Sequence, residues 1–180
     1  MGSEMCIRDS LDRHSAHTEH TGSYRARRIL MIVYRIAKKA YLSDLTGTGA
    51  RLYGGRWNKI GVPLTYTSSH LSLAVLELLA NQVQQLVDDS FGYIKISIPD
   101  NQIKRIDLPA LHQDWGLSPY HESTIQIGTS WAQHQDSLAL KVQSAVLHQE
   151  DNVLINPLHP SFNSISIIET AELDLDGRIL

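Results

Sequence analysis

Hydrophobic and polar residues alternate along much of the chain, which is the pattern of β-strands that bury one face of a sheet. One clean run, MIVYRI, covers residues 31–36, and a later one, GYIKISIP, covers residues 92–99. Further strands are expected at residues 62–68, 137–146 and 164–174. The pattern therefore predicts several short strands spread along the chain.

One segment has the period of an amphipathic helix instead. Within residues 71–87, apolar side chains recur at helical spacing at Leu71, Val75, Leu79, Val83, Leu86 and Val87. Ser68 or Ser69 is placed to cap the start of this helix. Residues 108–136 are punctuated by proline and glycine, so we expect loops with one or two short helices there. The predicted fold class is α+β, with short β-strands and one main helix.

The chain divides into a polar N-terminal segment and a single domain. A chain of 180 residues suits one domain, whose interior can shelter a ligand cleft. Residues 1–30 are rich in His and Arg and show no periodicity, so a leader or tail outside the core is expected. An ordered arm packed on the domain stays open as the alternative. The domain is expected to cover residues 31–180, with Met31 as a candidate start.

Composition narrows the class of protein. Hydrophobic residues make up 42% of the chain, and the net charge of −3 lacks the basic footprint of a direct nucleic-acid binder. No apolar run is long enough to cross a bilayer, so a cytoplasmic protein without membrane contact is expected. Cys6 is the single cysteine, and the nine histidines show no metal-ligand spacing. Neither a disulfide framework nor a metal site is therefore expected.

The densest unusual segment is TGTGARLYGGRWN at residues 46–58, where glycines alternate with Arg51, Arg56 and aromatic residues. Glycine lets the backbone approach a ligand closely, and arginine binds phosphate through a planar set of donors. The segment could cradle a dinucleotide, although it matches neither a Walker loop nor a Rossmann fingerprint. A hairpin turn with solvated arginines is an equal alternative.

Two charged residues within regular elements each allow two interpretations. Glu77 interrupts an apolar stretch of the predicted helix, so it is either a functional carboxylate or part of an exposed face shared with Asn81 and Gln84. Arg35 lies in the first predicted strand and is either an outward residue or a buried anion ligand. Strand alternation favours the outward position for Arg35.

A third cluster lies near the end of the chain, at Ser144 and residues 152–160. The pairs Asn156-Pro157 and His159-Pro160 require extended or turn geometry, which predicts a shaped loop. His159 could be a base or a ligand. No Gly-x-Ser-x-Gly elbow surrounds Ser144, so serine-hydrolase chemistry has little support.

Taken in order, these pieces resemble the RES domain, which is named for an arginine, a glutamate and a serine. The resemblance runs from residue 31 to residue 174, and its most specific motifs are GGRWN and INPLHP. The matching segments are Tyr34-Arg35, Gly49 to Arg51, Gly54 to Asn58, Tyr66 to Ser68, Ala74 to Glu77, Val142 to Ser144, Asn152, and Ile155 to Pro160. One departure is Gln143, where the family commonly has proline before the serine.

The resemblance implies a mixed fold like that of the ADP-ribosyltransferases, with short strands around an NAD cleft. It implies a toxin that is paired with an Xre-type antitoxin and that degrades NAD by hydrolysis or phosphorolysis. NAD would be the substrate, and no cofactor is implied. The residues assigned to NAD contact or catalysis are Arg35, Arg56, Tyr66, Glu77 and Ser144.

The resemblance also gives the residues chemical roles. Cleavage between nicotinamide and ribose builds positive charge on the ribose carbon, which Glu77 would stabilise, while Arg35 and Arg56 would neutralise the pyrophosphate. Tyr66 and Trp57 could stack on nicotinamide or adenine. Two other functions stay open, namely a mono-ADP-ribosyltransferase that modifies a protein and an inactive module that binds the antitoxin. A homodimer also stays open.

Overall fold

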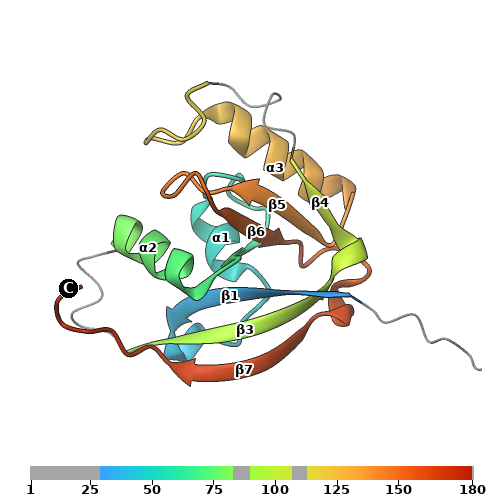
Figure 1. Ribbon diagram of the computed structural model, residues 1–180. Helices are drawn as coiled ribbons and strands as arrows, with labels where there is room; N and C mark the ends of the chain where they lie inside the picture. The colour runs from blue at the N-terminus through green and yellow to red at the C-terminus, as the bar shows by residue number, and fades with distance from the viewer. Residues whose placement is uncertain (1–28, 83–89, 107–112, 180) are drawn as a thin grey trace, which may run out of the picture.

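The computed structural model describes residues 29–82, 90–106 and 113–179, and in these residues seven strands form one sheet in the order β4-β5-β6-β2-β1-β3-β7 (Figure 1). All neighbouring strands are antiparallel except β4 and β5, which are parallel. The strands are β1 Leu30–Lys38, β2 Thr65–Ser68, β3 Phe91–Pro99, β4 Ile103–Arg105, β5 Ala139–Gln143, β6 Asp151–Ile155 and β7 Ser166–Glu172.

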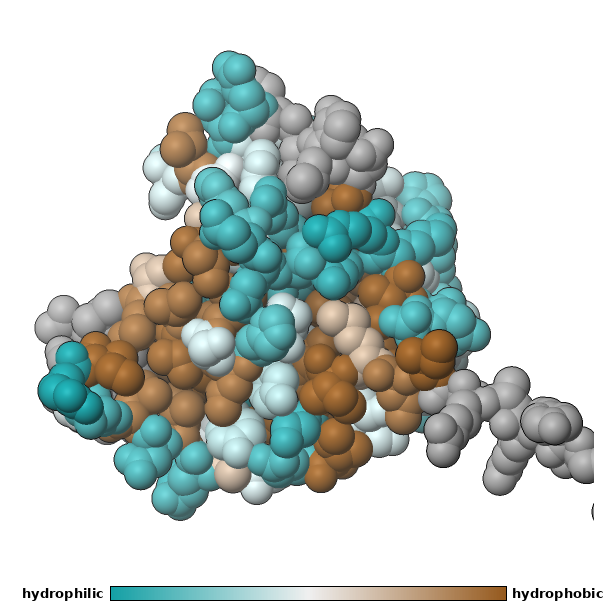
Figure 2. Space-filling model, in the orientation of Figure 1, coloured by the Kyte–Doolittle hydropathy of each residue, from teal (hydrophilic) through white to brown (hydrophobic). Residues whose placement is uncertain are grey.

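Helices pack around this sheet. The α-helices are α1 Thr48–Tyr53, α2 Leu71–Gln82 and α3 Glu122–His134, and short 3-10 turns lie at Lys39–Tyr41, Asp100–Gln102 and Phe162–Ser164. Helix α3 lies beside β4 and β5, whereas α2 packs on β1 and β2 (Figure 1). On the face seen in Figure 2, apolar residues gather over α2 and the strands below it, and hydrophilic residues gather toward α3.

Two hydrophobic clusters lie on opposite faces of the sheet, because side chains alternate along each strand. In β6, Val153 and Ile155 join one cluster with Val33 of β1, while Leu154 between them joins the other with Trp131 of α3. All three aliphatic residues of β6 have no exposed surface. Strand β6 is therefore buried on both faces, and it connects the two halves of the core.

The predicted α+β class is confirmed, and most predicted strands are present. Strands β1, β3 and β7 match the expected segments, β2 begins three residues later than expected, and β5 covers the middle of the expected run at 137–146. The predicted helix at 71–87 is confirmed as α2 up to Gln82, and the remaining residues to 87 lie outside the described part of the chain.

Three features were predicted wrongly. Strand β4 was not expected, and β6 occupies the start of a segment interpreted as a loop, because strand DNVLI buries both faces and lacks clean alternation. The loop itself begins at Asn156. The one or two short helices expected within residues 108–136 are instead one helix of 13 residues, α3, so α2 is not the one main helix. The sequence of α3 contains weak helix formers, including Gly128. A Cβ added at Gly128 would lie 2.0 Å from the Trp57 carbonyl oxygen.

The expected leader at residues 1–30 falls almost wholly outside the described residues, which begin with the exposed Ile29 and Leu30. Within the part of the chain that the structure describes, no helix is long and apolar enough to cross a membrane.

Candidate active site

Helix α2 points Glu77 toward the hairpin between β5 and β6. The Oε1 atom of Glu77 accepts hydrogen bonds from the Ser144 hydroxyl at 2.7 Å and from the Asn152 side-chain amide at 2.6 Å. The buried stripe of α2 contains Leu73 and Ala74, and Glu77 lies three and four residues further on, on that same face. The interpretation of Glu77 as an exposed-face residue is therefore wrong.

Ser144 is fully buried, with no exposed surface. Its hydroxyl oxygen accepts hydrogen bonds from the backbone N–H groups of Val146 and Leu147, both at 3.0 Å, and it donates its proton to Glu77. These contacts fill both acceptor positions and the one donor of a serine hydroxyl. In this structure Ser144 orients Glu77 and has no surface with which to touch a substrate.

Two further residues complete this arrangement, and the sequence did not indicate them as site residues. Ser68 and Asn152 lie opposite each other where β2 pairs with β6. The Ser68 hydroxyl donates to Oδ1 of Asn152 at 2.7 Å, and the amide nitrogen of Asn152 donates to Glu77. We call Glu77, Ser144, Asn152 and Ser68 the Glu77 group. Both newly found residues fall within the motifs quoted above, but only the strand register brings them together.

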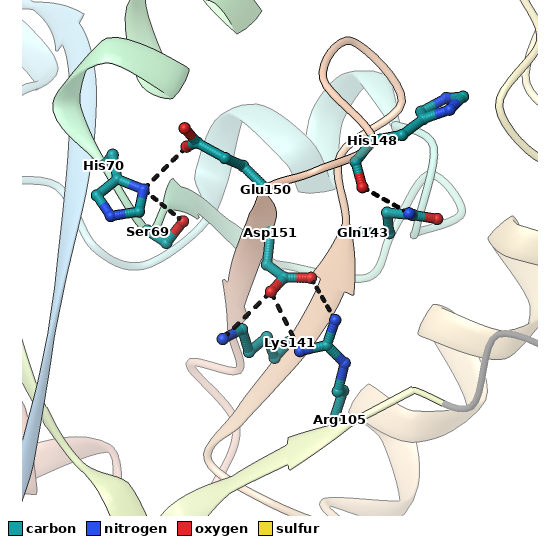
Figure 3. A network of polar contacts seen from close by, with 8 residues as sticks. All are labelled: Ser69, His70, Arg105, Lys141, Gln143, His148, Glu150 and Asp151. Atoms are coloured by element: carbon teal, nitrogen blue, oxygen red, sulfur yellow. Dashed lines mark hydrogen bonds and ion pairs between the residues drawn. The ribbon is translucent and has the colours of Figure 1, made fainter.

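A network of hydrogen bonds and ion pairs surrounds the hairpin between β5 and β6 (Figure 3). Asp151 binds Arg105 at 2.9 Å and Lys141 at 3.2 Å, so β4, β5 and β6 are joined beside the hairpin. His70, just before α2, lies 2.9 Å from the Glu150 carboxylate in the hairpin. This last contact joins the two elements that supply Glu77 and Ser144.

Arg56 lies in the glycine-rich segment, which folds as α1 followed by a tight turn in which Gly55 and Asn58 exchange backbone hydrogen bonds. The Nη1 atom of Arg56 donates to the carbonyl oxygens of Trp115 at 2.6 Å and Leu117 at 3.0 Å. Its guanidinium carbon lies 4.6 Å from the centre of the Tyr120 ring. Arg56 is half-buried and fixed, so the alternative of solvated arginines is wrong for Arg56, whereas Arg51 is exposed as that alternative expects.

Glu77 is one of the charges that act on Arg56. Burial lowers the pKa of Arg56, and the nearby Tyr120, Glu77 and Tyr66 oppose that shift. A cation in a partly desolvated setting with Glu77 in electrostatic range is suited to bind an anion that extends away from the carboxylate.

Tyr66 supports the turn that carries Arg56. Its hydroxyl donates to Oδ1 of Asn58 at 2.7 Å and accepts from the Trp57 N–H at 3.1 Å, and burial raises the pKa of Tyr66. A Cβ added at Gly55 would lie 2.6 Å from the Tyr66 hydroxyl oxygen, so the glycine is needed for this close approach.

Trp57 is a core residue. It is 3% exposed and packs in the cluster that contains Trp131, so its ring has no free face to stack on a base. The expectation that Trp57 stacks on the substrate is therefore wrong in this structure. The partly exposed Trp115, whose ring centre is 6.3 Å from that of Trp57 and 5.9 Å from that of His148, is the better candidate for such stacking.

Arg35 lies apart from the Glu77 group. Tyr34 pairs directly with Ser68 and so shares its face of the sheet, which leaves Arg35 on the opposite face. The Nη1 atom of Arg35 donates to the carbonyl oxygens of Tyr41 at 2.9 Å and Leu42 at 2.7 Å. Burial lowers the pKa of Arg35, and Asp44 opposes the shift. The outward position that alternation favoured is wrong, because the residue is half-buried on the face of the Val33 core.

His159 is also separate from the Glu77 group. Its Nδ1 atom accepts a hydrogen bond from the Ser161 N–H at 3.1 Å, in the turn after β6 and at the opposite end of that strand from Asn152. The histidine stabilises the expected shaped loop. Among the described residues, no group of three or more His, Cys, Asp or Glu side chains is arranged to hold a metal ion.

The family model for the RES domain matches residues 32–176 of this chain. The chain belongs to the RES domain family. Its curated relatives include "Toxin Res" of Photorhabdus laumondii, 37% identical over 83% of this chain and 97% of the relative, and "Toxin Res" of Yersinia enterocolitica, 36% identical over 83% and 99%. Another is the "Prs ADP-ribosylating toxin" of a Sphingobium species, 31% identical over 76% of this chain and 87% of the relative.

The RES fold of the chain is also similar to a solved structure. A chain in the crystal structure of the M. tuberculosis MbcT-MbcA toxin-antitoxin complex superposes with a TM-score of 0.65, covering 81% of this chain and 85% of that one at 18% identity. Of the residues that the RES resemblance assigns to the site, the structure joins Glu77 and Ser144 by a hydrogen bond. Tyr66 contacts the turn that carries Arg56, and Glu77 is among the charges that act on Arg56. Arg35 lies on the other face of the sheet from the Glu77 group.

Proposed function

We propose that this RES-domain chain is a toxin that cleaves the bond between nicotinamide and ribose in NAD. The observation that carries the proposal is the Glu77 carboxylate, held by Ser144 and Asn152 at 2.7 and 2.6 Å with the Arg56 cation in electrostatic range. A preorganised negative charge with a partly buried cation in electrostatic range suits a dinucleotide whose ribose carbon becomes positive during the reaction.

In the proposed reaction the bond between C1′ of the ribose and the pyridinium nitrogen breaks, and both bonding electrons leave with the nitrogen. Nicotinamide departs as a neutral molecule, and positive charge develops on the ribose. Glu77 stabilises this charge or holds a ribose hydroxyl as the bond breaks. Water or inorganic phosphate then adds its oxygen to C1′ and loses a proton. Because the leaving group is neutral, the cleavage requires no general acid.

Arg56 is proposed to bind the pyrophosphate. Only its Nη1 atom is used for the carbonyl oxygens of Trp115 and Leu117, and a guanidinium carries further N–H donors on its other nitrogens. The half-buried Tyr66 and the partly exposed Trp115 are proposed to contact the substrate's rings. Arg35 also uses only its Nη1 atom, for the carbonyl oxygens of Tyr41 and Leu42, but its place on the other face of the sheet from the Glu77 group favours a structural role for that residue.

A second candidate is transfer of ADP-ribose to a protein. It is favoured by the name of the Sphingobium relative, an ADP-ribosylating toxin that is 31% identical to this chain. The same cleavage step serves both functions, since only the acceptor that attacks C1′ differs.

The proposed partner is an antitoxin, of the Xre type that the RES resemblance implies, acting in the cytoplasm. Support comes from the fold, which is similar to a chain of a toxin-antitoxin complex. A carboxylate-bearing segment of the antitoxin that pairs with Arg56 would block the proposed pyrophosphate site. Binding of antitoxin and NAD should then be mutually exclusive, and calorimetry showing independent binding would contradict direct occlusion.

The central test measures nicotinamide release by the purified chain incubated with NAD, with and without phosphate. Chromatography of the products distinguishes ADP-ribose from its phosphorylated form, and intact-mass spectrometry of added cell proteins detects ADP-ribose adducts. Free ADP-ribose products support NAD degradation, whereas adducts in proportion to the released nicotinamide support transfer. Absence of nicotinamide release from folded protein in every condition would overturn the proposed function.

A further inference from the structure

The two oxygens of the Glu77 carboxylate have different surroundings. Oε1 accepts hydrogen bonds from both Ser144 and Asn152, whereas Oε2 accepts none from the described residues. Two donors that converge on one oxygen fix the rotation of the carboxylate, because turning it would break both charge-assisted bonds. Oε2 is therefore the oxygen left to face a ligand.

A hydrogen bond from Ser68 determines which end of the Asn152 amide faces Glu77. The Ser68 hydroxyl donates to Oδ1 of Asn152 at 2.7 Å, which leaves the amide NH₂ for Glu77. The reverse orientation would turn an amide oxygen toward a carboxylate, and neither of those groups can donate. Ser68 is 4% exposed and holds its position within the β2 and β6 pairing.

We infer that Asn152 is a positioning residue for the proposed reaction: backed by Ser68, it holds Oε1 of Glu77 so that Oε2 is presented to the ribose. The inference rests on the proposed function and adds to the arginine, glutamate and serine that give the RES domain its name. Asn152 acts through Glu77, so its effect on the reaction should depend on the Glu77 charge.

A polar side chain at position 152 lowers the stability of the fold unless its hydrogen-bonding groups are paired. On the same face of β6, two residues further along, Leu154 is fully buried and opposes Tyr66. An amide in a partly buried strand position is tolerated only when its donors and acceptors are paired. Here both the oxygen and the nitrogen of the amide are used, and the chain of contacts ends on Glu77.

A double-mutant cycle on the full chain tests the inference by nicotinamide release. Asn152→Ala should lower kcat about tenfold to a hundredfold, the range expected for loss of one hydrogen bond to a charged group, while KM stays within about twofold. In the Glu77→Gln background, the same Asn152→Ala change should alter kcat by less than about threefold. A purely structural role would give equal losses in both backgrounds.

Thr67→Val is the matched control. Thr67 is the neighbour of Ser68 in β2 and is 3% exposed. Its hydroxyl lies on the opposite face of the sheet from that of Ser68 and donates to the Val153 backbone carbonyl at 2.6 Å. The substitution removes a buried hydrogen bond between the same two strands without touching Glu77. Thr67→Val should lower the melting temperature but keep kcat, whereas Ser68→Ala should lower kcat in the same direction as Asn152→Ala.

If Asn152→Ala does not fold, Asn152→Asp serves as the second variant, because it keeps the size of the side chain. It removes the donor and places a second carboxyl group against Glu77, so it should lower kcat at least as much as Asn152→Ala. Unchanged kcat in a folded Asn152 variant, with Glu77→Gln impaired, would overturn the inference about Asn152 and leave the proposed function standing.

If the unmodified chain releases no nicotinamide, the proposed function fails. A crystal structure of Asn152→Ala then tests the positioning, since an unchanged Glu77 carboxylate would overturn it and a rotated one would support it.

Discussion

The Glu77 group and the two arginines are held in contrasting ways. Glu77 is oriented by side chains of β2, β6 and the hairpin after β5, through contacts between 2.6 and 2.7 Å that end on one carboxylate oxygen. Arg35 and Arg56 instead bind backbone carbonyl oxygens, each through its Nη1 atom. The carboxylate is thus aimed by its neighbours, whereas the arginines hold their neighbouring segments in place.

This difference indicates separate duties. A charge that must meet a developing positive charge needs a fixed direction before the reaction begins. A guanidinium with several donors can fix a loop with one nitrogen and still offer others to a phosphate. Arg56 has Glu77 in electrostatic range and can do both, whereas Arg35 has Asp44 as its charged neighbour on the other face of the sheet.

The largest effect is expected at Glu77. Glu77→Gln keeps the size of the side chain but removes the negative charge, so kcat for nicotinamide release should fall on the order of 10²-fold or more. NAD should still bind, since the charge matters most as the bond breaks. Thermal shift with and without NAD, measured beside turnover, checks both parts. Near-normal turnover in this variant would remove the catalytic assignment.

At Arg56 we expect a mixed loss. Arg56→Ala should weaken NAD binding about tenfold or more, because a charge-assisted contact with the pyrophosphate is lost in the ground state and transition state alike. The carbonyl oxygens of Trp115 and Leu117 also lose their donor. Titration calorimetry with NAD measures the first effect. Arg56→Lys keeps the charge without the planar donors and should recover only part of the affinity, and full affinity in Arg56→Ala would contradict the anion-binding role.

The sequence allowed the α+β class, the helix α2 and the long strands to be predicted, because their periodicity is strong and local. The sequence pattern led to a wrong prediction of the direction in which Glu77 points. The apolar spacing predicted a buried stripe through Leu71 and Val75, whereas Leu73 and Ala74 are the most deeply buried residues of the helix. Burial depends on which neighbours a helix meets, and that information is not local.

The contact between Ser68 and Asn152 could not be predicted for a related reason. The two residues are 84 positions apart, and their meeting depends on the register between β2 and β6. A shift of one residue would send either side chain to the other face. Helix α3 was obscured similarly, because Gly128 is required by contact with Trp57 rather than by the helix itself. The RES resemblance indicated which residues matter, but only the register between β2 and β6 shows that Ser68 and Asn152 meet.

Substitution of Arg35 should reduce the stability of the fold more than it reduces NAD binding. Arg35→Ala leaves the carbonyl oxygens of Tyr41 and Leu42 without their donor, which should cost about 1–3 kcal/mol in the free energy of unfolding. The loss of NAD affinity should be smaller than in Arg56→Ala. Urea denaturation and calorimetry on the two variants make the comparison. An unaltered free energy of unfolding with lost NAD binding would instead make Arg35 a substrate ligand, as the RES resemblance implies.

Tyr66→Phe should give a smaller loss in stability. The substitution keeps the ring but removes the hydroxyl that joins Asn58 to the Trp57 N–H, so about 1 kcal/mol should be lost from the free energy of unfolding. Because this turn carries Arg56, NAD affinity should decline modestly as well. Chemical denaturation and NAD titration measure the two effects. Equal affinity in both proteins would show that the turn holds Arg56 without the hydroxyl.

The smallest effect concerns the carboxylate beside Arg35. Hydrogen bonds from the side chain and the backbone N–H of Thr46, at 2.5 and 2.8 Å, lower the pKa of Asp44, and Arg35 adds to the shift. A lowered pKa in the folded state stabilises the fold above the unfolded-state pKa, and this contribution is lost as the pH falls through the folded-state value. Thr46→Val should therefore reduce stability at pH 6 by less than about 1 kcal/mol, because the site is partly solvated. The difference should shrink below about pH 3.

Denaturation curves recorded across this pH range test the Asp44 prediction. Thr46→Ser is the control, since it keeps the hydroxyl and should follow the unmodified protein. Nicotinamide release should be equal in all three proteins at pH 7, because Asp44 belongs to the Arg35 side of the sheet and not to the Glu77 group. A fall in kcat in Thr46→Val, with its stability intact, would join the two regions that the structure separates and would return Arg35 to the reaction.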